Sequence, residues 1–220
     1  MRLDVFTLFP EHFDWFLRQR HVANALAEGS EVRFRNYRDT TPLSAGQVDD
    51  SPYGGGAGMV MRVDVVDGAL EAAYGSDRDR VRKIALTPSG RLFDEPLAAE
   101  LAADQHLALL CGRYEGFDER VVEHLADEAI SIGHYVLAGG ELAAMVIADA
   151  VLRKLPGALG DAESAIEESY SEALAGAPEY PHYTRPADYR GWGVPEVLLS
   201  GDHARVREWR LAQARERARH

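Results

Sequence analysis

Apolar and polar positions along the chain alternate between short strand-like runs and longer stretches with helical spacing. Strand-length apolar runs occupy residues 3–8, 31–36, 82–86, 106–110 and 129–132. Helical spacing occupies residues 11–27, 63–74, 96–104, 118–125 and 141–155. Because strands and helices follow one another in turn, the pattern predicts an α/β domain with a mostly parallel sheet flanked by helices.

Three of the predicted helices have distinctive features. The first, 11–27, places Phe13, Phe16, Leu17, Ala23 and Ala27 on one face. The segment 118–125 begins with Asp118, a residue type that favours the N-cap position. The segment 141–155 is apolar on most faces and ends at Pro156 and Gly157, so we expect it in the core or at a subunit contact.

Composition fits a cytoplasmic enzyme of one large domain with a small appendage. The chain has 220 residues, of which 46% are hydrophobic. No apolar run approaches the ~18 residues of a membrane span, and the first residues lack the apolar stretch of a signal peptide. Cys111 is the single cysteine, which excludes an intrachain disulfide, and the eight histidines lack zinc-ligand spacing. We therefore predict no membrane association and assign no metal ligand.

The formal net charge of −12 argues by itself against a nucleic-acid partner, but the charge is unevenly distributed. Residues 157–180 contain six acids and no Lys or Arg, whereas residues 181–220 contain eight Arg against five acids. Arg205, Arg207 and Arg210 lie in this last segment, where they would suit phosphate contacts. A solvated helical face is the alternative interpretation.

Two glycine-containing segments follow strand-like runs in the middle of the chain. The first reads Gly112-Arg113-Tyr114-Glu115-Gly116 and the second reads Ile132-Gly133-His134-Tyr135-Val136-Leu137-Ala138-Gly139-Gly140. Neither is a dinucleotide or triphosphate signature. Glycines at a strand end let the main chain approach a ligand closely, although a single pair is more simply a tight turn. The two segments together favour a small-molecule pocket.

These segments resemble the bacterial tRNA (guanine-N1)-methyltransferase family. Four other stretches agree with that family in order along the chain: 8–13 (LFPEHF), 52–59 (PYGGGAGM), 86–91 (LTPSGR), and 181–186 (PHYTRP) with 198–203 (LLSGDH). The resemblance covers nearly the whole chain. Six motifs in the same order identify a family far more specifically than any single motif does.

The resemblance implies a fold that spacing would not reveal. Family members carry a trefoil knot in the sheet domain, form homodimers with shared active sites, and bind tRNA with a small, mainly helical C-terminal domain. The resemblance divides the chain into a donor-binding knotted domain (1–157), an acidic linker (158–180) and a tRNA-binding domain (181–220). Family members usually continue further, so we expect this C-terminal domain to be shortened and its grip on tRNA to be weaker.

The resemblance also implies S-adenosyl-L-methionine as methyl donor, and it leaves open whether activity requires Mg²⁺. The implied donor-binding residues are Leu86, Thr87, Pro88, Gly90, Gly112, Tyr114, Glu115, Gly116, Ile132, Gly133, Tyr135, Leu137, Gly139 and Gly140. We expect Gly139 and Gly140 to lie where a side chain would intrude on the donor. His134 replaces a family Asp beside this pocket, and its effect on donor affinity is left open.

Methylation of guanine N1 requires a base, because that nitrogen carries a proton at neutral pH. Loss of the proton moves negative charge to O6, where a cation stabilises the transition state. The resemblance assigns these roles to Glu168 and Arg153. Glu168 stands where the family has Asp; Glu167 is the rival base, and a solvated linker acid is the alternative for Glu168.

The remaining motif residues are assigned to the tRNA substrate. They are Tyr53, Ser169, His182, Tyr183, Arg185, Ser200 and His203. The implied reaction methylates the guanosine 3′-adjacent to the anticodon (position 37). A non-catalytic homologue that binds donor or RNA, and a knotted methyltransferase for another RNA, are the alternatives.

Overall fold

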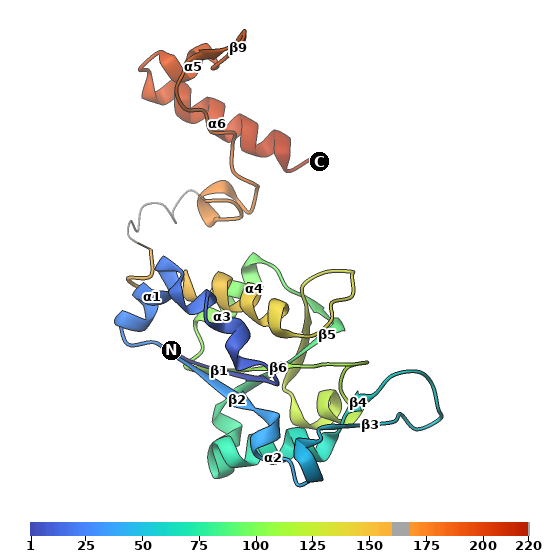
Figure 1. The fold of residues 1–220 in the computed structure, drawn as a ribbon. Helices are drawn as coiled ribbons and strands as arrows, with labels where there is room; N and C mark the ends of the chain where they lie inside the picture. The colour runs from blue at the N-terminus through green and yellow to red at the C-terminus, as the bar shows by residue number, and fades with distance from the viewer. Residues whose placement is uncertain (160–167, 220) are drawn as a thin grey trace. The chain divides into compact units, whose positions relative to one another are not determined.

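The computed structural model describes residues 1–159 and 168–219 (Figure 1). The chain divides into two compact units, Met1–Gly160 and Asp161–His220. Glu167, the rival base, lies outside the described residues. Each unit is described by itself below.

The first unit is built on a five-stranded sheet. In spatial order the strands are β2 (Glu31–Asn36), β1 (Arg2–Thr7), β6 (His106–Cys111), β5 (Arg82–Leu92) and β7 (Glu128–Ser131). Every neighbouring pair is parallel. The predicted parallel α/β sheet is confirmed, with a strand at each of the five predicted runs.

Helices cover both faces of this sheet (Figure 1). α1 (Arg20–Ala27), α3 (Glu95–Ala102) and α4 (Glu141–Leu152) pack on one face, and α2 (Val63–Tyr74) packs on the other. Successive strand residues point to opposite faces, so Val5 joins the first core cluster and Phe6 joins the second. A sheet buried on both faces explains why β6, its middle strand, is apolar from Leu107 to Cys111.

The prediction of one helix over residues 11–27 is wrong. The segment forms two 3₁₀ turns, η1 (Pro10–Phe13) and η2 (Phe16–Arg18), before α1 begins. Gln19 between η2 and α1 has extended backbone angles (φ −63°, ψ 137°). Phe13 and Phe16 are both buried, and the Phe13 ring lies 5.0 Å from that of Phe34 on β2. Packing of these rings on the sheet decides the local conformation over helical spacing.

The other helix ends also differ from the sequence expectation. Residues 118–125 contain only a five-residue π-helix, η6 (Val121–Leu125), and Asp118 instead accepts the N–H of Arg120 in a local turn (3.0 Å). α4 ends at Leu152, three residues early. α3 begins after Asp94, whose carboxylate accepts the N–H of Leu97 (2.9 Å).

Short elements complete both units. The first unit also contains η3 (Tyr37–Asp39), η4 (Ser44–Gly46), η5 (Gly75–Arg80) and the antiparallel pair β3 (Asp49–Asp50) and β4 (Val60–Met61). The second unit contains η8 (Glu172–Leu174), β8 (Asp188–Tyr189), β9 (Trp192–Gly193), α5 (Glu196–Leu199) and α6 (His203–Arg217). Within the described part of the chain, no helix combines the length and apolar character needed to cross a bilayer.

Candidate active site

The pairing of β5 with β7 is interrupted beside the candidate site. Leu86 and Arg91 both pair with Ile130 of β7, so the four residues between them leave the ladder. Gly90 closes this excursion: a Cβ there would lie 2.5 Å from the backbone carbon of Ala129. Only glycine permits so close an approach of two main chains. Gly90 therefore packs against the backbone of β7 and does not line the cavity at this edge of the sheet.

A cavity of about 250 Å³ lies at the carboxyl ends of β5, β6 and β7. Of the fourteen residues assigned to the donor, all but Gly90 line it. The other lining residues are Arg113, Phe117, Glu119, Val122, Ile130, Ser131, Val136 and Ala143. Segments that are distant in sequence thus meet around one space, as parallel strands bring their carboxyl ends to one edge. Their role in donor binding stays a prediction.

The two glycine segments touch through their main chains. The N–H of Gly140 donates to the carbonyl of Gly112 (2.9 Å), and Arg113 pairs with Gly139. A Cβ on Gly140 would lie 2.7 Å from Cα of Cys111, which is protein backbone rather than ligand space. A side chain at Gly140 would therefore first separate the two segments, and its intrusion on the donor stays a prediction.

An ion pair between Arg113 and Glu141 reinforces this junction. Nε of Arg113 lies 3.1 Å from Oε2 of Glu141, whose side chain is 5% exposed. Nη1 of Arg113 donates to the carbonyl of Ala138 (3.2 Å), and its guanidinium lies 4.4 Å from the ring centroid of Phe9. Thr7 donates its hydroxyl to Oε1 of Glu141 (2.8 Å). A buried charge needs such partners, so this network fixes how the segments meet.

Sequence reasoning did not assign Arg113 or Glu141 to the site. Both stand inside the quoted motifs, as the Arg of G-R-Y-E-G and the Glu of G-G-E-L. The motifs were the available signal, but the pairing joins residues 28 apart in sequence and only the fold brings them together.

Cys111 ends β6, directly before the cavity-lining Gly112, and is fully buried. Burial, together with the carboxylate of Glu141, raises the pKa of its thiol well above the usual value. The thiol therefore stays protonated near neutral pH and is a poor nucleophile. This agrees with the role of a small buried residue.

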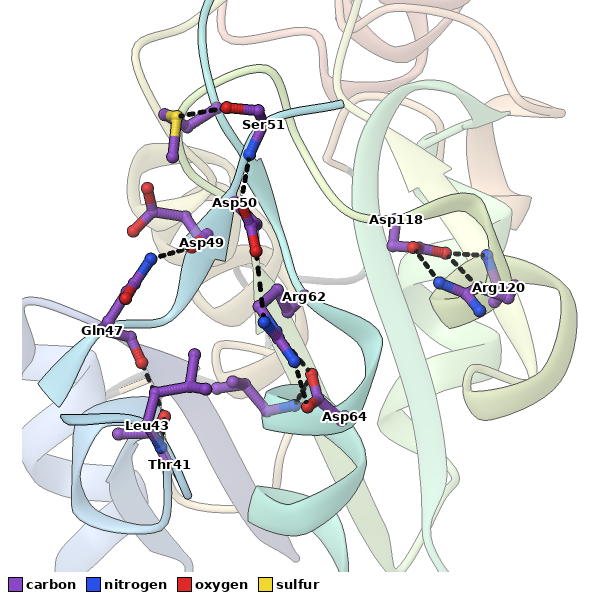
Figure 2. A network of polar contacts seen from close by, with 12 residues as sticks. Thr41, Leu43, Gln47, Asp49, Asp50, Ser51, Arg62, Asp64, Asp118 and Arg120 are labelled. Atoms are coloured by element: carbon purple, nitrogen blue, oxygen red, sulfur yellow. Dashed lines mark hydrogen bonds and ion pairs between the residues drawn. The ribbon is translucent and has the colours of Figure 1, made fainter. Parts of the chain in front are cut away.

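A network of ion pairs holds the base of a glycine loop, residues 51–59 (Figure 2). Arg62 bridges Asp50 (3.2 Å) and Asp64 (2.7 Å), and its N–H donates to the carbonyl of Val48 (3.0 Å). The hydroxyl of Ser51 lies 3.9 Å from the sulfur of Met59, across the base of the loop.

Main-chain hydrogen bonds tie the glycine loop to the cavity. The N–H of Glu115 donates to the carbonyl of Met59, and the N–H of Met61 donates to the carbonyl of Gly116, both at 2.9 Å. At the tip, Tyr53 is 100% exposed, and Gly54 and Gly55 have no atom within 4 Å of an added Cβ. The loop thus has a fixed base, an open tip and an exposed tyrosine.

The two residues assigned to catalysis lie in different units. Arg153 follows α4 in the first unit, donating its N–H to the carbonyl of Asp149 (3.2 Å). Glu168 is half-buried in the second unit, where its carbonyl accepts the N–H of Ser171 (3.0 Å). The next residue, Ser169, accepts the N–H of Glu179 on its hydroxyl (3.0 Å). The structure therefore places Glu168 on a hydrogen-bonded turn.

The other substrate residues of the second unit belong to two groups. His182 contacts Glu179 through Nε2 (2.8 Å), the Tyr183 ring lies 6.4 Å from that of Trp209, and Arg185 is exposed. Ser200 and His203 flank the turn between α5 and α6 and are also exposed. Their exposure leaves them accessible in this unit, while their role in tRNA binding stays a prediction.

Two further observations concern a second cavity and metal binding. A second cavity of about 510 Å³ borders the first, sharing Arg113, Leu137 and Gly139 with it. Across residues 1–159 and 168–219, no group of three or more His, Cys, Asp or Glu side chains is arranged to hold a metal ion.

The first unit defines a class, the α/β proteins that hold a small ligand beside the carboxyl ends of parallel strands. The model of the family described as tRNA (Guanine-1)-methyltransferase TrmD matches residues 1–220. The chain belongs to this family, and the resemblance seen in its motifs is confirmed.

Relatives named tRNA (guanine-N(1)-)-methyltransferase match over nearly their whole length. The chain is 50% identical to that of Brevibacillus brevis, covering 100% of this chain and 88% of the relative. It is 50% identical to that of Carboxydothermus hydrogenoformans (97% and 83%) and 48% identical to that of Sorangium cellulosum (97% and 89%).

Proposed function

We propose that this protein transfers a methyl group from S-adenosyl-L-methionine to N1 of the guanosine 3′-adjacent to the anticodon of tRNA. The observation that carries the proposal is the cavity on which the three donor segments converge, in a chain that matches the methyltransferase family from end to end. The tRNA substrate and the reaction follow from that family, while the position in tRNA and the residue roles are our proposal.

The cavity lining suits the donor. Leu86, Ile130 and Leu137 offer apolar contacts for a flat ring, and the main chain at the glycines offers hydrogen-bonding groups. Glu115 and Glu119 add carboxylates at the wall, which suit a ligand with cationic groups. When bound, the donor supplies an electrophilic methyl group on a sulfonium centre. Residues 1–159 and 168–219 offer no cluster of carboxylates that would hold Mg²⁺.

Glu168 is assigned as general base and Arg153 as the cation that stabilises charge on O6. A carboxylate can accept the N1 proton as the new bond forms, which contributes typically 10²–10⁴-fold to a rate. A guanidinium held near O6 opposes the negative charge that develops there. Glu is as basic as the family's Asp but one methylene longer, so the turn that carries Glu168 must accommodate the difference.

The trefoil knot and the shared active site belong to the same proposal. Support for the knot comes from the family, whose model matches residues 1–220. Support for a dimer comes from α4, where Leu142 and Val146 are 57% and 47% exposed on an otherwise buried helix. In that dimer, Arg153 of one subunit faces Glu168 of the other.

Two tRNA transcripts that differ only at the base after the anticodon test the reaction. The transcript with guanosine should accept a methyl group from labelled donor, and the transcript with adenosine should not. Methylation of both, or of neither, would contradict the proposed position. Donor binding measured by calorimetry separates a donor-binding protein without activity from a protein that fails to bind donor.

Substitutions test the assigned base. Glu168→Gln keeps the side chain's size but removes the proton acceptor, so the rate should fall roughly 10²–10⁴-fold with donor affinity unchanged. Glu168→Asp should stay active, and Glu167→Gln should matter little. If Glu167→Gln causes the loss instead, the rival residue is the base.

Mixed dimers test the shared site. Glu168→Gln subunits combined with Arg153→Ala subunits should regain activity, because one of the two sites in each heterodimer holds both intact residues. Mixtures that stay inactive while mass measurements show heterodimers would contradict the shared arrangement.

A further inference from the structure

A short hairpin in the second unit displays two aromatic rings to solvent. β8 and β9 pair antiparallel, with Tyr189 directly opposite Trp192. The turn consists of Arg190 and Gly191, both with positive φ (58° and 85°), as a two-residue hairpin turn requires. The N–H of Val194 donates to the carbonyl of Ala187 (2.8 Å), which extends the pairing below the strands.

The two rings, tilted 57° to one another, and a guanidinium form a small exposed cluster, here called the hairpin platform (Tyr189, Arg190 and Trp192). The ring centroids of Tyr189 and Trp192 lie 5.8 Å apart, and the Arg190 guanidinium lies 5.1 Å from the Tyr189 centroid. Tyr189 is 50% exposed and Trp192 is 70% exposed. Every residue from Tyr183 to Gly193 is exposed, so the platform contributes little to the core of its unit.

We propose that the hairpin platform stacks against an unpaired base of the tRNA. The inference rests on the proposed function and adds to it a second place of contact with the substrate, apart from the methylated guanine. Exposed aromatic rings bind unpaired bases by stacking, and a guanidinium beside them adds a cation–π contact. Paired bases are covered by their neighbours in the helix, so the platform fits a tRNA loop and not a stem.

Charge favours RNA over a protein partner at this surface. Residues 181–220 carry eight Arg against five acids, while the rest of this acidic chain carries the opposite balance. In the same unit, α6 exposes Arg205 and Arg207. A polyanion with flat bases matches this combination of cations and rings, since phosphates and bases are recognised by different side chains.

Trp192→Ala in the full-length protein tests the platform, with tRNA binding measured over a range of salt concentrations. The dissociation constant should rise about 5- to 100-fold, the effect of removing the stacking of one base. The salt slope should not change, because the substitution removes no phosphate contact. Trp192→Phe should restore most of the affinity, since a smaller ring still stacks. Leu199→Ala, which removes another side chain that is 61% exposed in this unit, is the matched control and should bind like wild type.

A blunt-ended RNA duplex of similar length distinguishes a base from the backbone. Trp192→Ala should bind this duplex as wild type does; equal weakening for duplex and tRNA would overturn stacking on an unpaired base. Unchanged tRNA affinity with a changed oligomeric mass would assign the platform to a protein interface, which also overturns the proposal. If wild-type protein methylates no tRNA, the proposed function fails; if it does so and Trp192→Ala binds tRNA normally, only the platform fails.

Discussion

The two units of this protein hold their candidate functional groups in opposite ways. In the first unit, two large clusters of buried side chains flank a parallel sheet, and the cavity lies at the strand ends. In the second, the cluster seen among described residues has only Leu174, Ala177 and Ala214 as buried members, and the hairpin rings and most of the arginines are exposed. A close-packed scaffold can hold a small ligand by shape, whereas a thinly packed unit must bind through exposed side chains.

Because the two units differ in packing, replacing an arginine by methionine should lower the melting temperature strongly in the first unit and little in the second. Arg113→Met in the first unit leaves Glu141 buried without its cation, and breaking a buried pair in this way costs about 3–5 kcal/mol. We expect a large fall in the melting temperature and loss of donor binding. Arg207→Met in the second unit, where the side chain is exposed, should change the melting temperature little. Equal shifts in calorimetric melting curves would refute the contrast.

Glycine substitutions sharpen the comparison at the level of the main chain. Gly140→Ala places a Cβ 2.7 Å from Cα of Cys111, an overpacking that costs about 1–3 kcal/mol. Donor affinity measured by calorimetry should fall at least tenfold, because the two lining segments must separate. In Gly193→Ala, the added carbon meets no atom within 4 Å, and the backbone at this position lies outside the left-handed region. It should leave both donor affinity and melting temperature unchanged.

Charge on α6 provides a smaller, RNA-specific effect. Arg205→Gln with Arg207→Gln should weaken tRNA binding and reduce its salt slope by ~0.9 for each duplex phosphate that the protein no longer neutralises. Arg210 is left intact because its guanidinium lies 4.7 Å from the centroid of Tyr180 and helps pack this unit. Filter binding at several salt concentrations measures the slope, with donor affinity as the control. An unaltered slope would assign these arginines to a solvated face.

The base of the glycine loop gives the smallest effect, and it depends on pH. Hydrogen bonding and charge from Arg62 lower the pKa of Asp64 below its usual 3.8. Because the folded-state pKa is the lower one, this stabilisation is present at neutral pH and is lost as pH falls through that pKa. Arg62→Gln should therefore reduce the urea midpoint slightly at pH 7, and the difference from wild type should shrink progressively as pH falls below 3.8. A difference that stays constant as pH falls would show that Arg62 acts by packing.

The sequence predicted secondary structure best where one physical signal dominated. Residues 63–74 show helical spacing, and α2 begins and ends at those residues. Residues 11–27 show similar spacing, yet Phe13 and Phe16 insert into the core and break the segment into separate turns. Spacing reports which residues prefer burial, but it does not report the shape of the surface that buries them.

For the candidate site, the sequence determined which segments converge, and the fold decided what each residue does there. Motifs indicated the segments assigned to the donor, and the fold brings them around one cavity. Gly90 and Gly140 show the limit: their role in donor binding stays a prediction, and the sequence did not show that a Cβ at either position would meet the protein's own backbone. The Arg113–Glu141 pair likewise exists only once β6 and α4 pack together. Local sequence specifies local conformation and chemistry, whereas contacts between distant segments depend on the packing of the whole unit, which only the tertiary structure supplies.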